Sequence, residues 1–365
     1  MRPAHGYFSR SYVQARSRFL AAAEDAGLLV EARLHPEKGR DGEDLAMDVA
    51  REGHPDAGRL LILSSACHGV EGYCGNGVQV AALLDPEFRD HARALGVAVL
   101  YIHGLNPYGF SHWRRTTHEN IDLNRNFHDF SKPLPANAAY REVHPLLVPE
   151  KWPPPAENQA AIGAYLAKWG VEALQAAISG GQHEFPDGLF YGGTQPSWSN
   201  KTLREVLRIH GRRAARIGWI DFHTGLGPAG VGERIFAGPD DHAAIQRARD
   251  WWDGAGETPV TSIYDGTSTS AVLTGLMWNS VLEECPQAEY TGIAMEYGTL
   301  PILDMLQALR ADQWLELHPQ APPELARAIK QQVLDAFFID TEEWKAQVLR
   351  QAREALFEAV DGLAS

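Results

Sequence analysis

Short runs of consecutive hydrophobic residues alternate along the chain with longer amphipathic segments. The runs are those expected of strands in a sheet that is covered on both faces. They comprise residues 45–50, 59–64, 97–102 and 217–222. Residues 12–26, and the segment that begins at 78–84, place hydrophobic residues at helical spacing. This rhythm predicts an α/β fold with a mixed, mostly parallel twisted central sheet and helices on both faces.

The second half of the chain is richer in helical patterns. They occur at residues 158–177, 201–215, about 302–315, and 323–363 with breaks. A proline-rich stretch between Lys132 and Pro155 has the composition of a linker, but candidate site residues lie on both sides of it. We therefore interpret it as a surface excursion, and expect one domain over residues 1–365 with a helix-rich C-terminal tail from about residue 302.

Composition narrows the choice of partners and location. Hydrophobic residues make up 44% of the 365 residues, and the formal net charge is −14. Such a charge argues against nucleic acid and anionic membranes as partners. The N-terminal segment lacks the hydrophobic core of a signal peptide, so we expect a cytoplasmic protein. Three cysteines, Cys67, Cys74 and Cys285, give no disulfide framework. The oligomeric state stays open.

A glycine-rich turn directly follows the hydrophobic run at 59–64. It reads Ser-Ser-Ala-Cys-His-Gly-Val-Glu-Gly and contains His68 and Glu71. A catalytic zinc site typically has three protein ligands and one open position for water. His223 is the best third candidate, because it also stands at the end of a hydrophobic run, just before Thr224-Gly225. Strand ends of an α/β sheet meet at one edge, where His68, Glu71 and His223 could share an ion. A lone His-x-x-Glu pair is a weak pattern, and a lone histidine such as His223 is more often a hydrogen-bonded structural residue.

Residues 105–127 form a third stretch of interest. An Asn-Pro-x-Gly turn is followed by Arg114 and Arg115, and then by Arg125 within Asp-Leu-Asn-Arg-Asn-Phe at 122–127. The planar guanidinium group suits a carboxylate or an oxyanion. A surface loop with solvated arginines is the alternative.

With these motifs together, the sequence resembles the zinc carboxypeptidases of the carboxypeptidase A type and the wider superfamily that includes aspartoacylase and succinylglutamate desuccinylase. The resemblance extends over about residues 58–300 and is most specific in the run at 122–127. The spacing from Glu71 to His223, and the tail after Glu296, are longer than in that family. The chain therefore resembles a separate branch rather than a digestive enzyme.

The resemblance implies a role for each matched residue. His68, Glu71 and His223 would bind zinc. Arg114 would polarise the scissile carbonyl, with Arg115 as its competitor. Asn124 and Arg125 would bind the carboxylate of the substrate. Glu296 would be the general base, and Tyr264 would close over the site with its loop.

The function implied is hydrolysis of an amide bond next to a free carboxylate, by a zinc metallocarboxypeptidase acting on short peptides. An N-acyl amino acid deacylase of the aspartoacylase type is the enzymatic alternative. A catalytically inactive binding protein of the same fold is the alternative from another class.

Three further features of the sequence bear on its function. Gly225-Leu-Gly-Pro-Ala-Gly230 matches a dinucleotide-binding pattern, but residues 231–236 look like a strand where that motif needs a helix. No Gly-x-Ser-x-Gly elbow of a serine hydrolase occurs. The aromatic and glycine-rich segment 180–193 could wall a substrate cleft or be an anchored surface loop, and its His183 is a rival zinc ligand that lacks a preceding strand.

Overall fold

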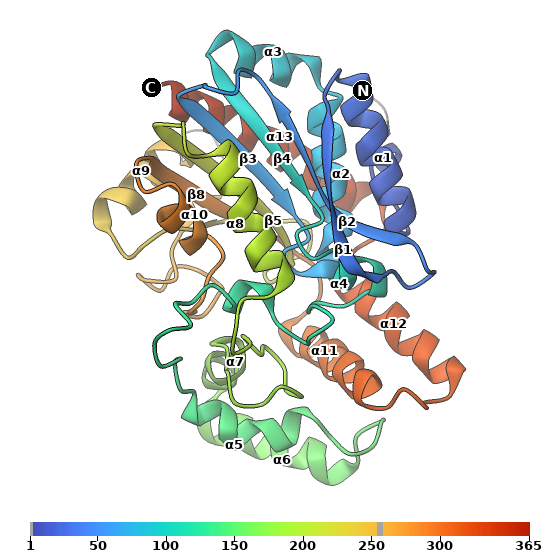
Figure 1. Cartoon of the computed structure of the whole chain (residues 1–365). Helices are drawn as coiled ribbons and strands as arrows, with labels where there is room; N and C mark the ends of the chain where they lie inside the picture. Colours follow the sequence, from blue (N-terminus) through green and yellow to red (C-terminus); the bar gives the residue numbers. More distant parts are fainter. Residues whose placement is uncertain (1–2, 254–257) are drawn as a thin grey trace.

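Strands of the central sheet carry the site. The computed structural model describes residues 3–253 and 258–365, and within them the strands form one mixed sheet in the order β1-β2-β4-β3-β5-β8-β6-β7 (Figure 1). The strands are β1 (Val30–Lys38), β2 (Asp44–Glu52), β3 (Arg59–Ser65), β4 (Val97–His103), β5 (Arg216–Gly225), β6 (Gly232–Phe236), β7 (Val260–Thr261) and β8 (Glu289–Gly298).

The middle of the sheet is parallel and its flanks are mixed. Strands β4, β3, β5 and β8 run parallel to one another. Antiparallel pairs join β1 to β2, β2 to β4, and β6 to β8, while β7 runs parallel to β6. The carboxyl ends of the four central strands therefore meet at one edge, where ligand sites of α/β sheets form.

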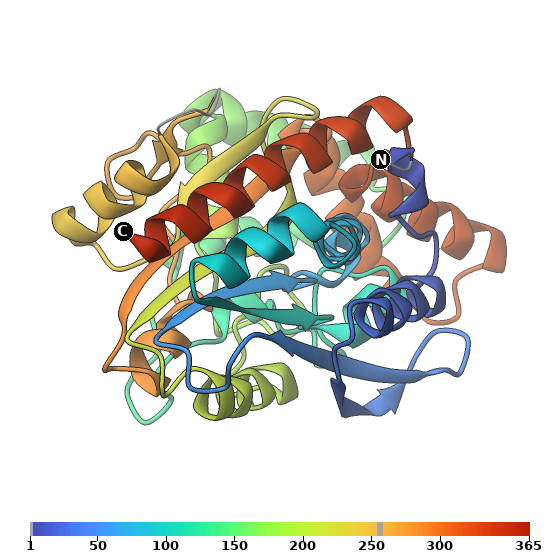
Figure 2. The ribbon, with the colours of Figure 1, turned by 90° about the horizontal axis from the view of Figure 1, so that it is seen from above.

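Helices cover both faces of the sheet. One face packs against α1 (Tyr12–Asp25), α2 (Gly72–Leu83), α3 (Pro86–Ala94), α9 (His242–Trp252) and α13 (Glu342–Ala364). Figure 2 shows α13 and α2 lying on that side of the sheet, with α8 on the other. The opposite face packs against α8 (Trp198–His210) and α10 (Asn279–Glu284). Because both faces are covered, the central strands can be continuously hydrophobic.

A group of helices lies beyond the strand ends (Figure 1). It contains α5 (Ala138–Leu147), α6 (Ala156–Trp169), α7 (Val171–Ser179), α11 (Ile302–Leu317) and α12 (Pro323–Phe337). Side chains of α5, α7, α11 and α12 share one hydrophobic cluster. Short helical segments complete the fold: α4 (Pro107–His112) and the 3-10 turns Ala4–Gly6, Gly69–Glu71 and Leu123–Arg125.

The fold class expected from the sequence is confirmed, and most predicted elements match closely. The helix expected at 12–26 is Tyr12–Asp25, and the strand expected at 217–222 is Arg216–Gly225. The helix expected at 158–177 is broken into α6 and α7 at Gly170, whose φ of 85° ends the first helix. The predicted surface excursion at 132–155 contains one helix of its own, Ala138–Leu147.

A buried ion pair ties the first helix to the sheet. Asp48 of β2 is fully buried and accepts hydrogen bonds from Arg16 Nε at 2.8 Å and from Arg16 Nη2 at 3.0 Å. His103 Nδ1 lies 3.7 Å from the same carboxylate. Burial opposes ionisation of Asp48, but His103 and Arg16 outweigh it and hold its pKa below the usual value.

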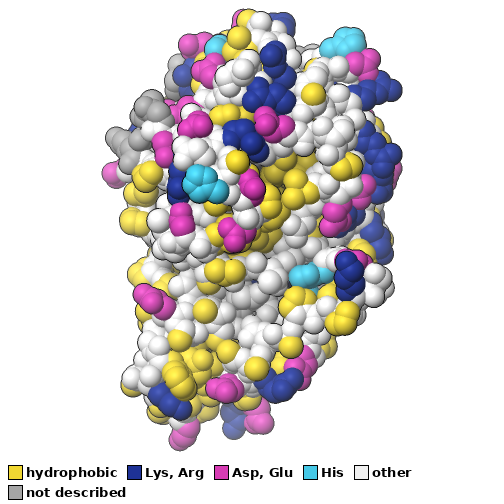
Figure 3. Space-filling model, turned by 90° about the vertical axis from the view of Figure 1, so that its left-hand side faces the viewer, with side chains coloured by type: hydrophobic (Ala, Val, Ile, Leu, Met, Phe, Trp, Pro, Cys, Tyr) yellow, Lys and Arg dark blue, Asp and Glu magenta, His cyan; other side chains and the backbone are white. Residues whose placement is uncertain are grey.

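The described surface carries mixed charges. On the face drawn in Figure 3, acidic and basic side chains are interspersed, and hydrophobic side chains gather in a hollow near the middle. None of the described helices is both long enough and hydrophobic enough to cross a membrane.

Candidate metal centre and active site

Tight packing shapes the turn after β3. A Cβ atom at Gly69 would lie 2.1 Å from the carbonyl carbon of Gly109, and one at Gly75 would lie 2.6 Å from the Cβ of Ser65. Glycine is therefore needed where the turn passes α4 and where α2 lies on the sheet. The preceding Ala66 has a φ of 61°, a left-handed conformation that is unusual for a residue with a side chain. This turn aims His68 and Glu71 at the end of β5.

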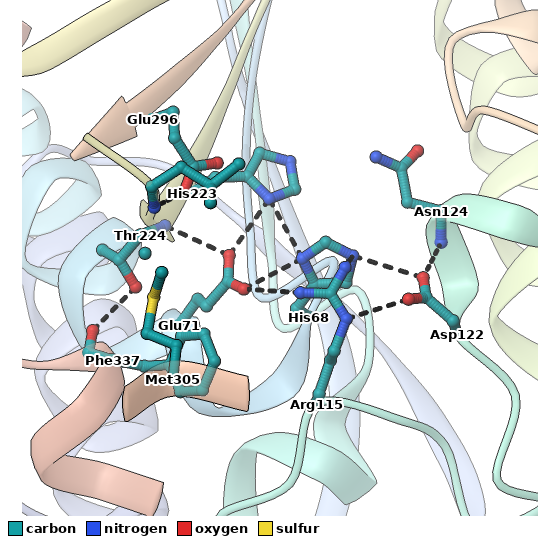
Figure 4. Close-up of polar contacts among 12 residues, drawn as sticks. His68, Glu71, Arg115, Asp122, Asn124, His223, Thr224, Glu296, Met305 and Phe337 are labelled. Carbon is teal, nitrogen blue, oxygen red and sulfur yellow. Dashed lines mark hydrogen bonds and ion pairs between the residues drawn. The ribbon is translucent and has the colours of Figure 1, made fainter. Parts of the chain in front are cut away.

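His68, Glu71 and His223 meet at the strand ends (Figure 4). His68 Nδ1 lies 2.9 Å from Glu71 Oε1 and 3.3 Å from His223 Nδ1. His223 Nδ1 lies 3.1 Å from Glu71 Oε2. All three residues are buried, with at most 5% of their surface exposed. The structure thus brings together the three residues that the sequence predicted as metal ligands.

The spacing of these atoms fits a zinc ion. A tetrahedral site with bonds of about 2.0–2.1 Å places its ligand atoms about 3.3–3.4 Å apart. The Nδ1 atoms of His68 and His223 are 3.3 Å apart, and both face the Glu71 carboxylate. Two imidazole nitrogens that face each other need either a proton or a cation between them. Two nitrogens and a carboxylate are the donor set of many catalytic zinc sites.

Carboxylates stand behind both histidines. Asp221 Oδ2 lies 2.5 Å from His223 Nε2, and Asp122 Oδ1 lies 3.3 Å from His68 Nε2. Burial lowers the pKa of His223, but Asp221 and Glu71 outweigh it and raise this pKa well above its usual value. A carboxylate in this position fixes the ring so that Nδ1 points to the metal.

Cys67 and Asp221 lie near His223 in a second possible grouping of ligand atoms. Burial raises the pKa of the Cys67 thiol well above its usual value, and nearby carboxylates add to the shift. The thiolate is the form that binds metals, so a protonated Cys67 is a poor ligand. The grouping of His68, Glu71 and His223 is therefore the better candidate.

Arg115, rather than Arg114, reaches the cluster. Arg115 Nη1 lies 3.3 Å from Glu71 Oε1, and its Nε donates to Asp122 Oδ2 at 2.8 Å. Arg114 turns away toward α11, where its Nε donates to Asp312 at 3.1 Å and its Nη1 lies 3.1 Å from Glu316. The structure does not bring Arg114 to the site, so the competing candidate from the sequence takes its position.

The backbone explains this choice between adjacent arginines. Gly69 N donates to Arg115 O at 3.1 Å, and Val70 N donates to Arg114 O at 2.8 Å. These bonds hold the arginine segment against the ligand turn. In this arrangement Arg115 faces the ligands and Arg114 faces α11.

Glu296 lies beside the cluster on β8. It pairs with His223 across the β5–β8 ladder, and its Oε1 accepts a hydrogen bond from Leu226 N at 2.9 Å. Burial, together with the negative charge of Glu71, raises the pKa of Glu296 to about 7. Figure 4 shows its carboxylate next to the His223 ring. The structure thus brings Glu296 to the site.

Asn124 and Arg125 line the cavity next to the cluster. Arg125 donates from Nε and Nη2 to Ser179 O at 2.8 and 2.6 Å, and from Nη1 to Asn124 O at 2.8 Å. These bonds use three of the five N–H groups of a guanidinium, which leaves two for a ligand. Burial lowers the pKa of Arg125 to about 10. Asn124 Oδ1 accepts from Met277 N at 2.8 Å.

Two candidate residues lie outside the cluster. Tyr264 is half-buried and donates from its hydroxyl to Gly238 O at 3.0 Å, while its neighbour Ile263 lines the cavity. The ring nitrogen Nδ1 of His183 lies 2.6 Å from Gly193 O, and the ring packs against His128. The structure therefore brings neither Tyr264 nor His183 to the possible metal ligands.

The loop at 180–193 reaches the cavity through Phe190. This residue lines the cavity, and its ring lies 4.7 Å from the guanidinium carbon of Arg115. Its φ of 51° is rare for a bulky side chain, and such strain is often found at functional sites. Of the residues that sequence reasoning missed, Asp221 carried a readable signal: it stands two positions before His223 on one strand, so both side chains share a face.

The glycine motif at 225–230 leads into β6, which pairs antiparallel with β8. The predicted strand at 231–236 is thus confirmed, and the helix that would hold a pyrophosphate is not there.

Comparison with solved structures identifies the class of fold. Carboxypeptidase A from Helicoverpa armigera is 13% identical, with a TM-score of 0.50 over 97% of this chain and 73% of that chain. A metallo-carboxypeptidase from Burkholderia cenocepacia is 10% identical, with a TM-score of 0.45 over 97% of this chain and 70% of that chain. One from Pseudomonas aeruginosa is 16% identical, with a TM-score of 0.40 over 88% of this chain and 67% of that chain. The fold is that of the metallocarboxypeptidases, as the resemblance in sequence implied.

At the level of sequence, the chain belongs to the family described as "Protein of unknown function (DUF2817)", whose profile matches residues 8–351. No curated protein matches it in sequence.

Proposed function

We propose that this chain is a zinc-dependent hydrolase that cleaves an amide bond next to a free carboxylate, in the manner of a metallocarboxypeptidase. The observation that carries the proposal is the meeting of His68, Glu71 and His223 at tetrahedral ligand spacing, with Glu296 and Arg115 alongside. The fold of the metallocarboxypeptidases supports it.

His68, Glu71 and His223 would hold the zinc ion through Nδ1, the carboxylate and Nδ1, respectively. A bound zinc ion polarises a carbonyl group and lowers the pKa of a water molecule. Asp221 keeps the His223 ring in orientation through its Nε2 atom. At His68 Nε2 the nearer partner is Arg115 Nη2 at 2.8 Å, with Asp122 Oδ1 at 3.3 Å.

Glu296 is the proposed general base. Its carboxylate takes a proton from the attacking water while the water oxygen adds to the carbonyl carbon. The carbon–nitrogen bond then breaks, and Glu296 delivers the proton to the leaving nitrogen. The products are a carboxylic acid and a free amine.

Arg115 and Arg125 have separate proposed roles, in stabilising the transition state and in binding the substrate. Arg115 lies next to Glu71 and offsets the charge that develops on the carbonyl oxygen, a role in which one lost donor typically costs about 100- to 1000-fold in rate. Arg125 uses its two remaining N–H groups, together with Asn124, to bind the carboxylate of the substrate. Tyr264 keeps the loop-closing role implied by the resemblance only if its hydrogen bond to Gly238 breaks.

Metal analysis and hydrolysis test the proposal together. The purified protein should contain about one zinc per chain, and both His68→Ala and His223→Ala should lose it. His183→Ala is the matched control, since this histidine lies outside the cluster and should leave the zinc content unchanged. Zinc retained by either ligand variant would remove that residue from the site.

Replacing Glu296 separates an enzyme from an inactive binding protein. Glu296→Gln should keep its zinc and lose hydrolysis of a C-terminal peptide bond or of an N-acyl amino acid. If the wild type and Glu296→Gln are equally inactive on both substrates while binding zinc, the binding protein is the better description.

A further inference from the structure

A hydrophobic cavity extends from the candidate metal centre to the space between α7 and α11. Its volume is about 180 Å³. The lining includes Val171, Leu174 and Ile178 of α7 and Ile302, Leu306 and Leu309 of α11. His68, Glu71, His223 and Glu296 lie at its catalytic end. The cavity is therefore continuous with the atoms that would carry out the reaction.

Helices α7 and α11, which are distant in sequence, together form the hydrophobic wall of this cavity. Helix α7 lies in the extra length between Glu71 and His223, and α11 lies in the tail after Glu296. Their side chains share one hydrophobic cluster, which includes Leu174 and Leu309. Arg125 anchors the end of α7 through Ser179 O. Both segments that lengthen the chain thus meet over the same cavity.

The wall offers little to a polar substrate group. Among the cavity-lining residues of α7 and α11, only Gln175 and Ser179 are polar. Gln175 Nε2 already donates to Thr269 O at 2.9 Å, and Ser179 Oγ donates to Gln175 O at 2.7 Å. No carboxylate from these two helices lines the cavity to receive an ammonium group. Burying an unpaired polar group is costly, so a peptide chain fits this wall poorly.

We propose that the acyl part of the substrate is an aliphatic chain that lies between α7 and α11, so that the substrates are N-acyl amino acids. The inference rests on the proposed function, which it narrows to one substrate class. An engineered apolar cavity of about 150 Å³, lined by Leu, Ile and Phe, binds benzene. The cavity of about 180 Å³ is therefore large enough to take a short aliphatic chain. Hydrolysis adds water across the amide bond and releases a fatty acid and the free amino acid.

A chain-length series tests the proposal. N-acetyl-, N-butanoyl-, N-hexanoyl- and N-octanoyl-alanine are compared for binding to the metal-free protein by isothermal titration calorimetry, and for kcat/KM with the zinc-loaded protein. Each fully buried methylene should raise affinity roughly fourfold. Because part of the chain stays exposed, we expect octanoyl to exceed butanoyl by about tenfold or more in both measurements.

A matched pair of variants on α11 locates the chain. Leu303 and Leu306 line the cavity, whereas Leu317 lies at the far end of the same helix and does not. Leu303 and Leu317 are 46% and 40% exposed, so glutamine at either position costs little stability. The double variant Leu303→Gln/Leu306→Gln should lower the ratio of octanoyl to acetyl affinity by about tenfold. Leu317→Gln should leave the ratio at its wild-type value.

The outcomes separate this inference from the proposed function. Chain-length-dependent binding without hydrolysis of any compound would overturn the hydrolase and leave the cavity assignment standing. Hydrolysis that is equal for acetyl- and octanoyl-alanine would overturn the inference and leave the hydrolase standing. Faster hydrolysis of leucyl-alanine than of octanoyl-alanine would identify a peptide substrate and also overturn the inference.

Discussion

Asp221 provides the sharpest test of how the candidate metal centre is supported. Its Oδ2 lies 2.5 Å from His223 Nε2, and its Oδ1 accepts a hydrogen bond from Ser64 Oγ at 2.5 Å. Asp221→Asn keeps the shape of the side chain but removes the charge. The histidine ring then loses the carboxylate that orients it for metal binding.

The size of the effect follows from the hydrogen bond. A hydrogen bond to a charged group contributes about 1.5–3 kcal/mol. At about 1.4 kcal/mol for each factor of ten, the zinc dissociation constant of Asp221→Asn should rise about 10- to 100-fold. Loss of such an outer partner weakens metal binding by a similar factor in other proteins.

Competition with a chromogenic chelator measures the zinc affinity of wild type, Asp221→Asn and Ser64→Ala. Ser64→Ala is the control, because it removes the other partner of the same carboxylate and leaves the bond to His223 in place. We expect a change of less than about threefold for this control. An Asp221→Asn affinity equal to that of wild type, in a variant that unfolds at the wild-type temperature, would refute the reasoning.

Three other predictions concern catalysis, packing and pH. Arg115→Ala should lower kcat about 100- to 1000-fold. Arg114→Ala should instead cost about 1.5–3 kcal/mol of unfolding free energy, because it removes one cationic partner of buried Asp312, which keeps its bond to Lys330. Kinetics and urea unfolding distinguish the two variants, and equal kinetic losses would contradict the assignment. Gly75→Ala should destabilise the protein by about 1–3 kcal/mol in urea unfolding, and Gly163→Ala, with nothing within 4 Å of its new Cβ, should not. The folded-state pKa of Asp48 is lowered, so the ionised carboxylate stabilises the fold above the usual carboxyl pKa of 3.8, and this stabilisation is lost as the pH falls through the folded-state pKa. The urea midpoint should therefore fall more steeply in acid for the wild type than for Asp48→Asn. Parallel curves of urea midpoint against pH would contradict this.

Hydrophobic runs predicted the centre of the sheet well and its edges poorly. Strands β3, β4 and β5 are buried on both faces, so burial alone marks them in the sequence. Strand β1 at the edge was not predicted, because it is largely exposed, carries polar residues and contains Pro36. The position of β1 depends on its pairing with β2, and the hydrophobic pattern of β1 alone carries no information about that pairing.

The candidate site also has a part that local sequence patterns predicted and a part that they did not. His68 and His223 were readable because each follows a hydrophobic run and precedes a glycine within two residues. The choice between Arg114 and Arg115 was not readable, since it depends on backbone bonds from Gly69 and Val70. The wall between α7 and α11 was also beyond the sequence pattern, because it forms by packing of helices that are far apart in the chain.

Two threonine hydroxyls connect the strand ends to the last turn of α12. Thr224 Oγ1 donates to Phe337 O at 2.7 Å, and Thr299 Oγ1 donates to Ala336 O at 2.7 Å. During synthesis, every residue of the candidate site leaves the ribosome before these two acceptors do. A nascent or truncated chain that stops short of residue 336 would leave both hydroxyls without their acceptors. We therefore expect the candidate site to reach its final arrangement only near the end of translation.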